Sequence, residues 1–210
     1  MAQRRPRSGL SRRTGPPGRL RIVAGKWRSR VLPVADVPGL RPTSERIRET
    51  LFNWLQPYIE GARCLDLFAG SGALGLEALS RGAAQVTFVE SSGVASANLR
   101  RAFETLDAAG AELVQANAYQ WLESSAPGSY DIVLLDPPFA DDALGGLCAT
   151  LEERGWLAPA AWIYLEQDRS RPLPDLPAGW ALTHEKTAGN VRYALACRKP
   201  PRGTDHEVRA

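Results

Sequence analysis

From residue 62 onward, short apolar runs alternate with segments of helical periodicity, and this alternation leaves few folds open to the chain. Strands that alternate with helices form a parallel sheet covered by helices on both faces. The pattern predicts strands near 62–68, 84–90, 112–116, 130–136 and 161–167, and helices near 72–81, 93–108, 118–124 and 142–153. Strand-like residues 180–187 and 191–198 around Gly189-Asn190 predict a final antiparallel hairpin. We therefore expect an α/β fold with a mostly parallel sheet.

Two basic segments precede this alternation. Residues 1–19 are rich in Arg, Pro and Gly and hold almost nothing to bury, so we expect a flexible arm. Residues 20–32 have short β-type runs around Gly25, which predict a small basic hairpin carrying an exposed Trp27. Basic side chains beside an exposed tryptophan can contact phosphates while the ring stacks on a base.

A helix is expected near 44–55, with Thr43 or Ser44 as its cap and apolar residues at helical spacing. Length and the 44% hydrophobic content fit one buried domain. We expect that domain to cover 20–200. Within it, 20–42 forms the basic hairpin and lead-in, 43–200 forms the helix and catalytic core, and 201–210 form a flexible tail.

The net charge of +3 conceals a strong asymmetry between the two ends of the chain. Residues 1–35 hold ten Arg or Lys and no acid, whereas residues 36–210 hold sixteen against twenty-three acids. Such segregation favours a polyanionic partner gripped at one end, because neutralised phosphates release counterions. A solubilising tail is the alternative interpretation of residues 1–19.

Several classes of protein are disfavoured by composition. No apolar run approaches a membrane span of about 18 residues, and no signal peptide follows the N-terminal arginines, so we expect a soluble cytoplasmic protein. Cys64, Cys148 and Cys197 are far apart and predict neither a disulfide framework nor a zinc site. We interpret them as apolar fillers and expect no bound metal.

A glycine-rich segment, residues 64–75 (CLDLFAGSGALG), runs from a buried strand into a helix. Glycines at such a turn let the backbone approach a ligand closely. Residues 70–75 match G-x-G-x-x-G, and Glu90 lies twenty residues after Gly70 at the end of the next strand, as a ribose-binding acid would. A nicotinamide dinucleotide site and an S-adenosylmethionine site share this pattern.

The acid Asp66, just before the glycines, favours the methyl donor, because methyltransferases place a carboxylate near the methionine ammonium there. Asn117 and Ala118 follow the third strand, where methyltransferases hold the adenine, although an asparagine after a strand is often only a helix cap. The predicted S-adenosylmethionine-binding residues are Asp66, Phe68, Gly70, Ser71, Gly72, Glu90, Asn117 and Ala118.

The tetrapeptide Asp136-Pro137-Pro138-Phe139 follows the apolar strand 130–136. Ligands of open α/β sheets bind at the carboxyl ends of the strands. An amino group conjugated to a base is a poor nucleophile, so a catalyst must accept hydrogen bonds from it; Asp136 and the Pro137 carbonyl are the expected acceptors. Phe139 is expected to stack on the base. The predicted catalytic residues are therefore Asp136, Pro137 and Phe139.

Over residues 20–199 the chain resembles the bacterial 16S ribosomal RNA guanine-N2 methyltransferases of the RsmD type. The resemblance lies in RIVAGKWR (21–28), GLRPTSERIRETLFNWL (39–55), the 64–82 segment, DPPF (136–139) and EKTAGNV (185–191). Residues 39–55 are the most specific of these. Ser92 departs from the family, which often has an acid there, and the 1–19 arm is not a shared feature.

This resemblance implies a Rossmann-like class I methyltransferase fold with seven strands and S-adenosylmethionine as methyl donor. It also implies one guanine of 16S rRNA as acceptor, on an assembling 30S particle, and we expect a monomer. Arg41, Thr43 and Arg46 are implied to lie near the mouth of the active site. The residues expected to contact RNA are thus Arg21, Lys26, Trp27, Arg28, Arg30, Arg41, Thr43 and Arg46.

Three other functions compete with this interpretation. A DNA adenine-N6 methyltransferase uses the same tetrapeptide, but such enzymes usually carry a recognition domain for which this chain has no room. A dehydrogenase would explain the glycines and leave residues 136–139 unused. A non-catalytic RNA-binding protein would need neither Asp136 nor the glycines.

Overall fold

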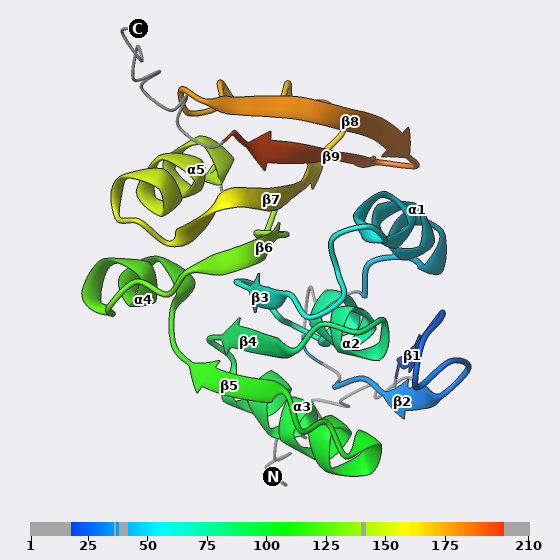
Figure 1. Cartoon of the computed structure of the whole chain (residues 1–210). Helices are drawn as coiled ribbons and strands as arrows, with labels where there is room; N and C mark the ends of the chain where they lie inside the picture. The colour runs from blue at the N-terminus through cyan, green and yellow to red at the C-terminus, as the bar shows by residue number, and fades with distance from the viewer. Residues whose placement is uncertain (1–17, 36, 38–41, 140–141, 200–210) are drawn as a thin grey trace, which may run out of the picture.

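A seven-stranded sheet organises the chain in the computed structural model, which describes residues 18–35, 37, 42–139 and 142–199. The strand order is β5-β4-β3-β6-β7-β9-β8 (Figure 1). The strands are β3 (Arg63–Asp66), β4 (Gln85–Glu90), β5 (Ala111–Gln115), β6 (Tyr130–Leu135), β7 (Leu157–Asp168), β8 (Trp180–Ala188) and β9 (Val191–Arg198). The strands from β5 to β7 are parallel, whereas β9 is antiparallel to β7 and to β8.

Helices cover both faces of this sheet. They are α1 (Glu45–Leu55), α2 (Ala73–Ser80), α3 (Gly93–Leu106), α4 (Ala118–Ser124) and α5 (Leu144–Glu153). One core cluster joins the first three helices to one face of the sheet, and a second joins α4 and α5 to the other face (Figure 1). Strands buried on both faces explain the continuous apolar runs that the sequence shows there.

The α/β fold expected from the sequence is confirmed, with every predicted strand and helix present within a few residues of its expected bounds. One difference lies in β7, which begins at Leu157 instead of residue 161. Its register with β6 shifts between Tyr130 and Ile132. Pro159 lies in this early part of the strand, where an irregular pairing tolerates a residue that has no N–H to donate.

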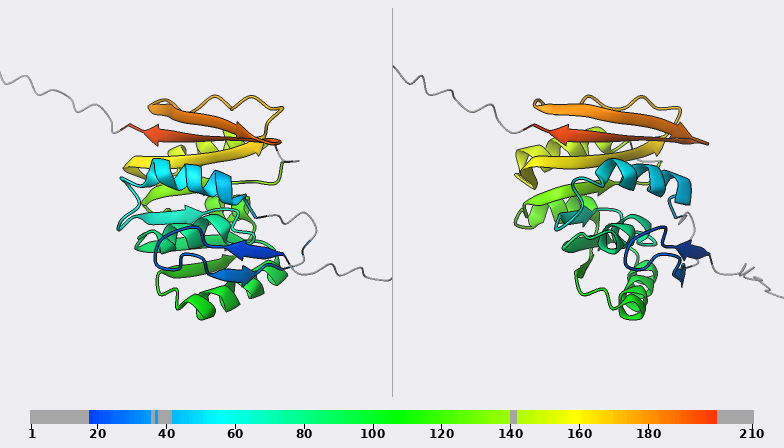
Figure 2. Two further views of the ribbon diagram at one scale, coloured as in Figure 1. Left: turned by 90° about the vertical axis from the view of Figure 1, so that its right-hand side faces the viewer. Right: turned by 45° about the vertical axis from the view of Figure 1, so that its right-hand side comes forward.

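The N-terminal part forms a separate two-stranded ribbon, β1 (Arg19–Arg21) antiparallel to β2 (Val31–Pro33). Figure 2 shows it on the same side of the sheet as α1. The loop between the two strands packs on the end of α2, where Lys26 N–H donates to the Ser80 carbonyl at 2.6 Å. Gly25 has φ +81°, and a Cβ there would lie 1.8 Å from the Ser80 oxygen, so only glycine fits this approach.

The structure describes little of the two ends of the chain. The predicted arm 1–19 and tail 201–210 lie almost wholly outside the described residues, as does Arg41. Within the described ranges, no helix has the length and apolar character to cross a membrane. The three cysteines are free thiols; Cys64 and Cys148 are buried, while Cys197 is partly exposed.

Candidate active site

Four acids gather at the carboxyl edge of the central strands. Glu90 ends β4, Asp66 ends β3, Asp136 follows β6 directly, and Glu166 lies near the end of β7. These strands are neighbours in the sheet, so the acids lie side by side along one edge. Glu90, Asp66 and Asp136 are residues predicted from the sequence, whereas Glu166 is not.

The loop after β3 is built around two glycines in left-handed conformations, Gly70 with φ +53° and Gly72 with φ +78°. The Gly72 N–H donates to the Ala69 carbonyl at 2.6 Å and closes a tight turn at the start of α2. A Cβ at Gly72 would lie 2.6 Å from Cδ2 of Leu99. The glycines therefore bring bare backbone to the helix N-terminus, where a ligand can approach it closely. Ser71, between the two glycines, is buried.

Asp66 lies buried behind this loop, where its Oδ2 accepts a hydrogen bond of 2.9 Å from the Gly75 N–H. Burial raises the pKa of Asp66 to about 7, the Gly75 hydrogen bond opposes that rise, and the nearby charges of Asp136 and Glu90 add to it. Gly75 is itself confined, because a Cβ there would lie 2.3 Å from the Phe88 ring. The carboxyl group is thus held firmly against the first turns of α2.

Glu90 receives two backbone hydrogen bonds. Its Oε2 accepts from the Gly70 N–H at 2.7 Å and its Oε1 accepts from the Ser92 N–H at 2.6 Å. Each oxygen keeps a further lone pair, so the carboxylate is fixed and still able to accept from a diol. Ser92, which replaces the acid often found in the family, has a local role: its hydroxyl caps α3 by accepting from the Ala95 N–H at 3.3 Å.

Asn117 acts as the cap of α4 in this structure. Its Oδ1 accepts hydrogen bonds from the N–H groups of Tyr119 and Gln120 at 3.1 and 3.2 Å. The side-chain oxygen of Asn117 therefore acts as a helix cap. Its amide nitrogen is not needed for the cap. Nearby, the rings of Phe68 and Tyr119 meet edge to face with centroids 5.8 Å apart, and Ala118 is buried.

Asp136 is held by a residue from the segment before α1. The Thr43 hydroxyl donates to its Oδ2 at 3.3 Å. Burial raises the pKa of Asp136 to about 6, and the Thr43 hydrogen bond opposes that rise. Of the residues that follow, Pro137 is buried, whereas Phe139 is partly exposed. Asp136 thus stays mostly ionised at neutral pH and can accept hydrogen bonds.

Glu166 and Tyr164 form a buried pair beside Asp136 that sequence analysis missed. The Tyr164 hydroxyl donates to Oε2 of Glu166 at 2.6 Å. Burial and then the charge of Asp136 raise the pKa of Glu166 to about 8. The available signal was an acid directly after the apolar run Trp162-Ile163-Tyr164-Leu165, where a solvent-facing residue is not expected.

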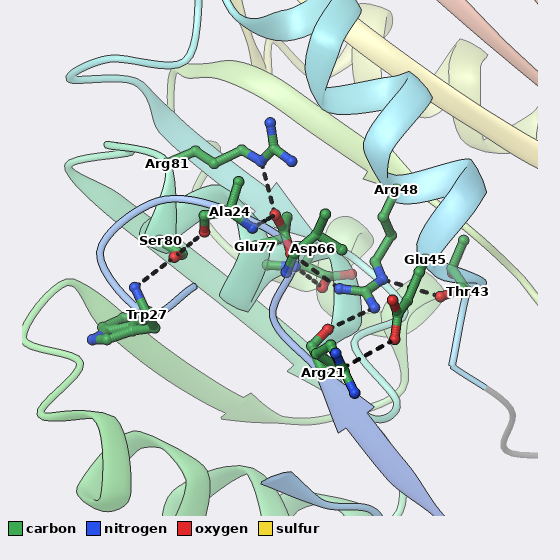
Figure 3. Close-up of polar contacts among 12 residues, drawn as sticks. Arg21, Ala24, Trp27, Thr43, Glu45, Arg48, Asp66, Glu77, Ser80 and Arg81 are labelled. Carbon is green, nitrogen blue, oxygen red and sulfur yellow. Dashed lines mark hydrogen bonds and ion pairs between the residues drawn. The ribbon is translucent and has the colours of Figure 1, made fainter. Parts of the chain in front are cut away.

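A second missed cluster joins the N-terminal ribbon to the site (Figure 3). Glu77, fully buried in α2, accepts from the N–H groups of Val23 and Ala24 at 2.8 and 3.0 Å and pairs with Arg48 and Arg81 at 3.0 and 2.8 Å. Its signal was a lone acid within an otherwise apolar helix.

Arg48 extends this cluster toward Asp136. Besides Glu77 it donates to the carbonyls of Thr43 and Arg21, at 3.1 and 2.8 Å. The same arginine therefore fixes the backbone of Thr43 and the end of the N-terminal ribbon (Figure 3). Thr43, expected at the mouth of the site, is 8% exposed and acts through its contact with Asp136.

The expectation of an exposed Trp27 is wrong. Trp27 is only 7% exposed, and its backbone N–H donates to the Ser80 hydroxyl at 3.0 Å, because the loop folds onto α2 and turns the ring into the core. A buried ring cannot stack on a base. Thr43, also expected to contact RNA, is buried as well, whereas Arg21, Lys26, Arg28, Arg30 and Arg46 are exposed.

Arg21 and Arg30, among these exposed cations, also make polar contacts within the protein. Arg21 lies 3.7 Å from the Glu45 carboxylate, and Arg30 donates to the Thr105 carbonyl at 3.1 Å. Both contacts are at the surface and leave donors available. In the described ranges, no group of three or more His, Cys, Asp or Glu side chains is arranged to hold a metal ion.

The chain is similar in sequence and in structure to known methyltransferases. The chain is 50% identical over 182 residues to the Ribosomal RNA small subunit methyltransferase D of Escherichia coli strain K12, covering 87% of this chain and 91% of that protein. The solved structure of yhhF from Escherichia coli, named as a methyltransferase, superposes with a TM-score of 0.81 at 47% identity, covering 88% and 100% of the two chains. At 16% identity, SMU.776 complexed with SAH shares the fold, with a TM-score of 0.64 over 76% of this chain and 50% of that one.

The strand order, the glycine loop and these likenesses define a Rossmann-like class I methyltransferase fold. The model of the family described as "Conserved hypothetical protein 95" matches residues 20–197. The chain belongs to that family, and the resemblance to RsmD-type methyltransferases is confirmed.

Proposed function

We propose that this protein is a ribosomal RNA methyltransferase that transfers a methyl group from S-adenosylmethionine to the exocyclic N2 of a guanine in 16S rRNA. The observation that carries the proposal is the placement of Asp136 beside the glycine loop, at one edge of the sheet, in a chain of this family. Guanine 966, on an assembling 30S particle, is the proposed position, as the family resemblance implies.

The residues at the carboxyl ends of β3 and β4 fit the methyl donor. Glu90 is held by backbone N–H groups and can accept from both ribose hydroxyls. Gly70 and Gly72 offer backbone without side chains, and the carboxyl group of the buried Asp66 would lie near the methionine end of the donor. Asn117, with Ala118 and Phe68, borders the place of the adenine ring. The donor supplies a methyl group already activated by a positively charged sulfur.

Asp136 and the Pro137 carbonyl are the acceptors that orient the amino group. As the nitrogen lone pair forms a bond to the methyl carbon, the carbon–sulfur bond breaks and its electron pair stays on sulfur. Positive charge grows on the nitrogen meanwhile, and acceptors already in place stabilise it selectively in the transition state. Phe139 is partly exposed, and its ring would stack on the base.

The methylated nitrogen must then lose one proton, and Asp136 is the group that can take it. Burial raises the pKa of Asp136 to about 6, so its carboxylate is ionised at neutral pH and is a stronger base than an ordinary aspartate. The proton passes from there to solvent, and the free acceptor is regenerated.

The RNA reaches this site across the basic N-terminal ribbon. Lys26, Arg28 and Arg30 are exposed on the loop between β1 and β2, on the same side of the sheet as α1 (Figure 2). Arg46 is exposed in the first turn of α1, three residues from Thr43. These cations and Arg41 would bind phosphates on either side of the target guanine. We propose that the protein acts as a monomer.

The identity of the methylated nucleoside tests this function. Purified protein, labelled S-adenosylmethionine and 30S particles from a strain lacking the modification are incubated together, and the RNA is digested to nucleosides. We expect label in N2-methylguanosine. Duplex DNA serves as the parallel substrate, because a DNA adenine-N6 methyltransferase is the nearest alternative. Label found only in N6-methyladenine of that DNA would overturn the proposal.

A further inference from the structure

Glu166 lies beside the catalytic aspartate in the sheet. Leu135 of β6 pairs with Leu165 of β7 in parallel register, so the next residues, Asp136 and Glu166, occupy neighbouring positions on strands about 5 Å apart. Both face the side covered by α1, since Asp136 contacts Thr43 and Glu166 contacts Tyr164 of the same core cluster. Glu166 is 4% exposed, which an unpaired carboxylate would not tolerate.

Among the described residues, donors and acids surround Glu166, and no cation is paired with its carboxyl group. Tyr164 lies on its own strand, Tyr193 of β9 is its register partner, and Asp136 is its neighbour on β6. Arg48 of α1 is committed to Glu77, and Nζ of Lys186, on β8, lies over the Trp54 ring. A carboxyl group in this setting is most stable when it holds a proton.

We propose that Glu166 is a positioning residue for the proposed methyl transfer: as a neutral acid it donates a hydrogen bond to Asp136 and holds that carboxylate toward the acceptor amino group. The Tyr164 hydroxyl already donates to Oε2 of Glu166, so the proton lies on Oε1. Burial and the charge of Asp136 raise the pKa of Glu166 to about 8, while that of Asp136 is raised by burial to about 6. At neutral pH the two groups therefore hold one proton, and it resides on Glu166.

This inference rests on the proposed function and predicts a pH dependence specific to Glu166. In the wild-type protein the single-turnover rate falls above about pH 8, because ionised Glu166 loses its donor and adds a charge beside Asp136. Glu166→Gln keeps a donor in its amide group and accepts from Tyr164, so its rate at pH 7 stays within about threefold of wild type and this fall disappears. Glu166→Ala lowers the turnover rate about 10-fold to 100-fold and leaves KM for the RNA nearly unchanged.

An NMR titration of the protein without RNA or methyl donor tests the protonation of Glu166 independently of the proposed function. The side-chain carboxyl carbons of labelled, full-length protein are followed by NMR from pH 4 to pH 9. We expect the Glu166 signal to titrate near pH 8 and the Asp136 signal near pH 6, the latter in Glu166→Gln as well, since glutamine resembles the neutral acid. If Glu166 titrates near its ordinary value of about 4, the inference is wrong even where methylation of guanine is observed.

The turnover rates of the Glu166 variants also test the proposed role of the Glu166 proton. If Glu166→Gln loses as much turnover as Glu166→Ala, or keeps the fall above pH 8, the residue does not act through its proton and the inference is overturned. Should Glu166→Ala fail to fold, Tyr164→Phe replaces it: removing the hydroxyl takes away a hydrogen bond that opposes the raised pKa of Glu166, so the fall near pH 8 moves to higher pH. An unmoved fall would count against the proposal.

Discussion

The hydroxyl of Thr43 donates a hydrogen bond of 3.3 Å to Oδ2 of Asp136, across 93 residues of sequence. This contact ties the segment before α1 to the tetrapeptide after β6, and the Thr43 backbone is tied in turn to Arg48. The position of the proposed catalytic carboxylate thus depends on Arg48, which also anchors the N-terminal ribbon.

Replacing Thr43 with valine should move the acid limb of the methylation rate to higher pH. The Thr43 hydrogen bond lowers the pKa of Asp136 against the effect of burial, which raises it to about 6. Without the hydroxyl, Asp136 stays protonated to higher pH, and the limb in kcat/KM moves up by as much as about one pH unit. Thr43→Ser keeps the hydroxyl and is the matched control. An identical limb in Thr43→Val and wild type would mean that the contact does not act on Asp136.

The Arg48–Glu77 pair should be a large contributor to stability. Both side chains are at most 2% exposed, and removing one partner of a buried pair costs about 3–5 kcal/mol. We therefore expect Arg48→Met to lower the free energy of unfolding in urea by about that much. The exposed pair Arg154–Glu123, at 3.4 Å, supplies the control, because Arg154→Met should cost less than about 1 kcal/mol. Equal costs for the two substitutions would contradict this account of the cluster.

Gly25 should tolerate no side chain. Its φ of +81° disfavours other residues, and a Cβ would lie 1.8 Å from the Ser80 carbonyl oxygen. Gly61 has a similar φ of +72° but open space around it. Gly61→Ala should therefore cost only about 1 kcal/mol for the backbone conformation, whereas Gly25→Ala should also detach the loop between β1 and β2 from α2. Limited proteolysis after Arg28 and Arg30 measures the detachment. Similar cleavage rates in the two variants would count against it.

Asp66 should make the stability of the protein depend on pH. Burial raises the pKa of Asp66 to about 7, above an unfolded value of about 4. The folded state therefore binds the proton more tightly, and this contribution is present below about pH 4 and is lost as pH rises toward 7. Compared with Asp66→Asn, the wild type should lose up to about 4 kcal/mol over that range. Urea unfolding of both proteins at pH 4, 5.5 and 7 gives the difference, and a constant difference would contradict the assignment.

The parts of the fold that the sequence predicts are those set by local pattern. Apolar runs and glycines placed β3 to β6 and the loop around Gly70 within a few residues, because a buried parallel strand needs a continuous apolar run. The hairpin around Gly189-Asn190 was equally local. The order of the strands in the sheet was not predicted, because the family resemblance implied only a class I fold with seven strands.

The features that escaped prediction depend on contacts distant in sequence. Trp27 looks like an exposed ring beside basic residues, and only the approach of Gly25 to Ser80 turns it inward. Glu77 and Glu166 stand among apolar neighbours in sequence, but their partners Arg48 and Asp136 lie about thirty residues away on other elements. These acidic side chains are buried because of tertiary partners that no local pattern specifies.

The most direct test of the proposed chemistry is the single-turnover methylation of 30S particles by Asp136→Ala. The particles lack the modification, the methyl donor is labelled, and binding of S-adenosylhomocysteine is measured in parallel by calorimetry. We predict that turnover into N2-methylguanosine falls about 100-fold or more, because the main acceptor of hydrogen bonds from the amino group is lost. The dissociation constant for S-adenosylhomocysteine should stay within about threefold of the wild-type value. Turnover within tenfold of wild type would contradict the central role of Asp136.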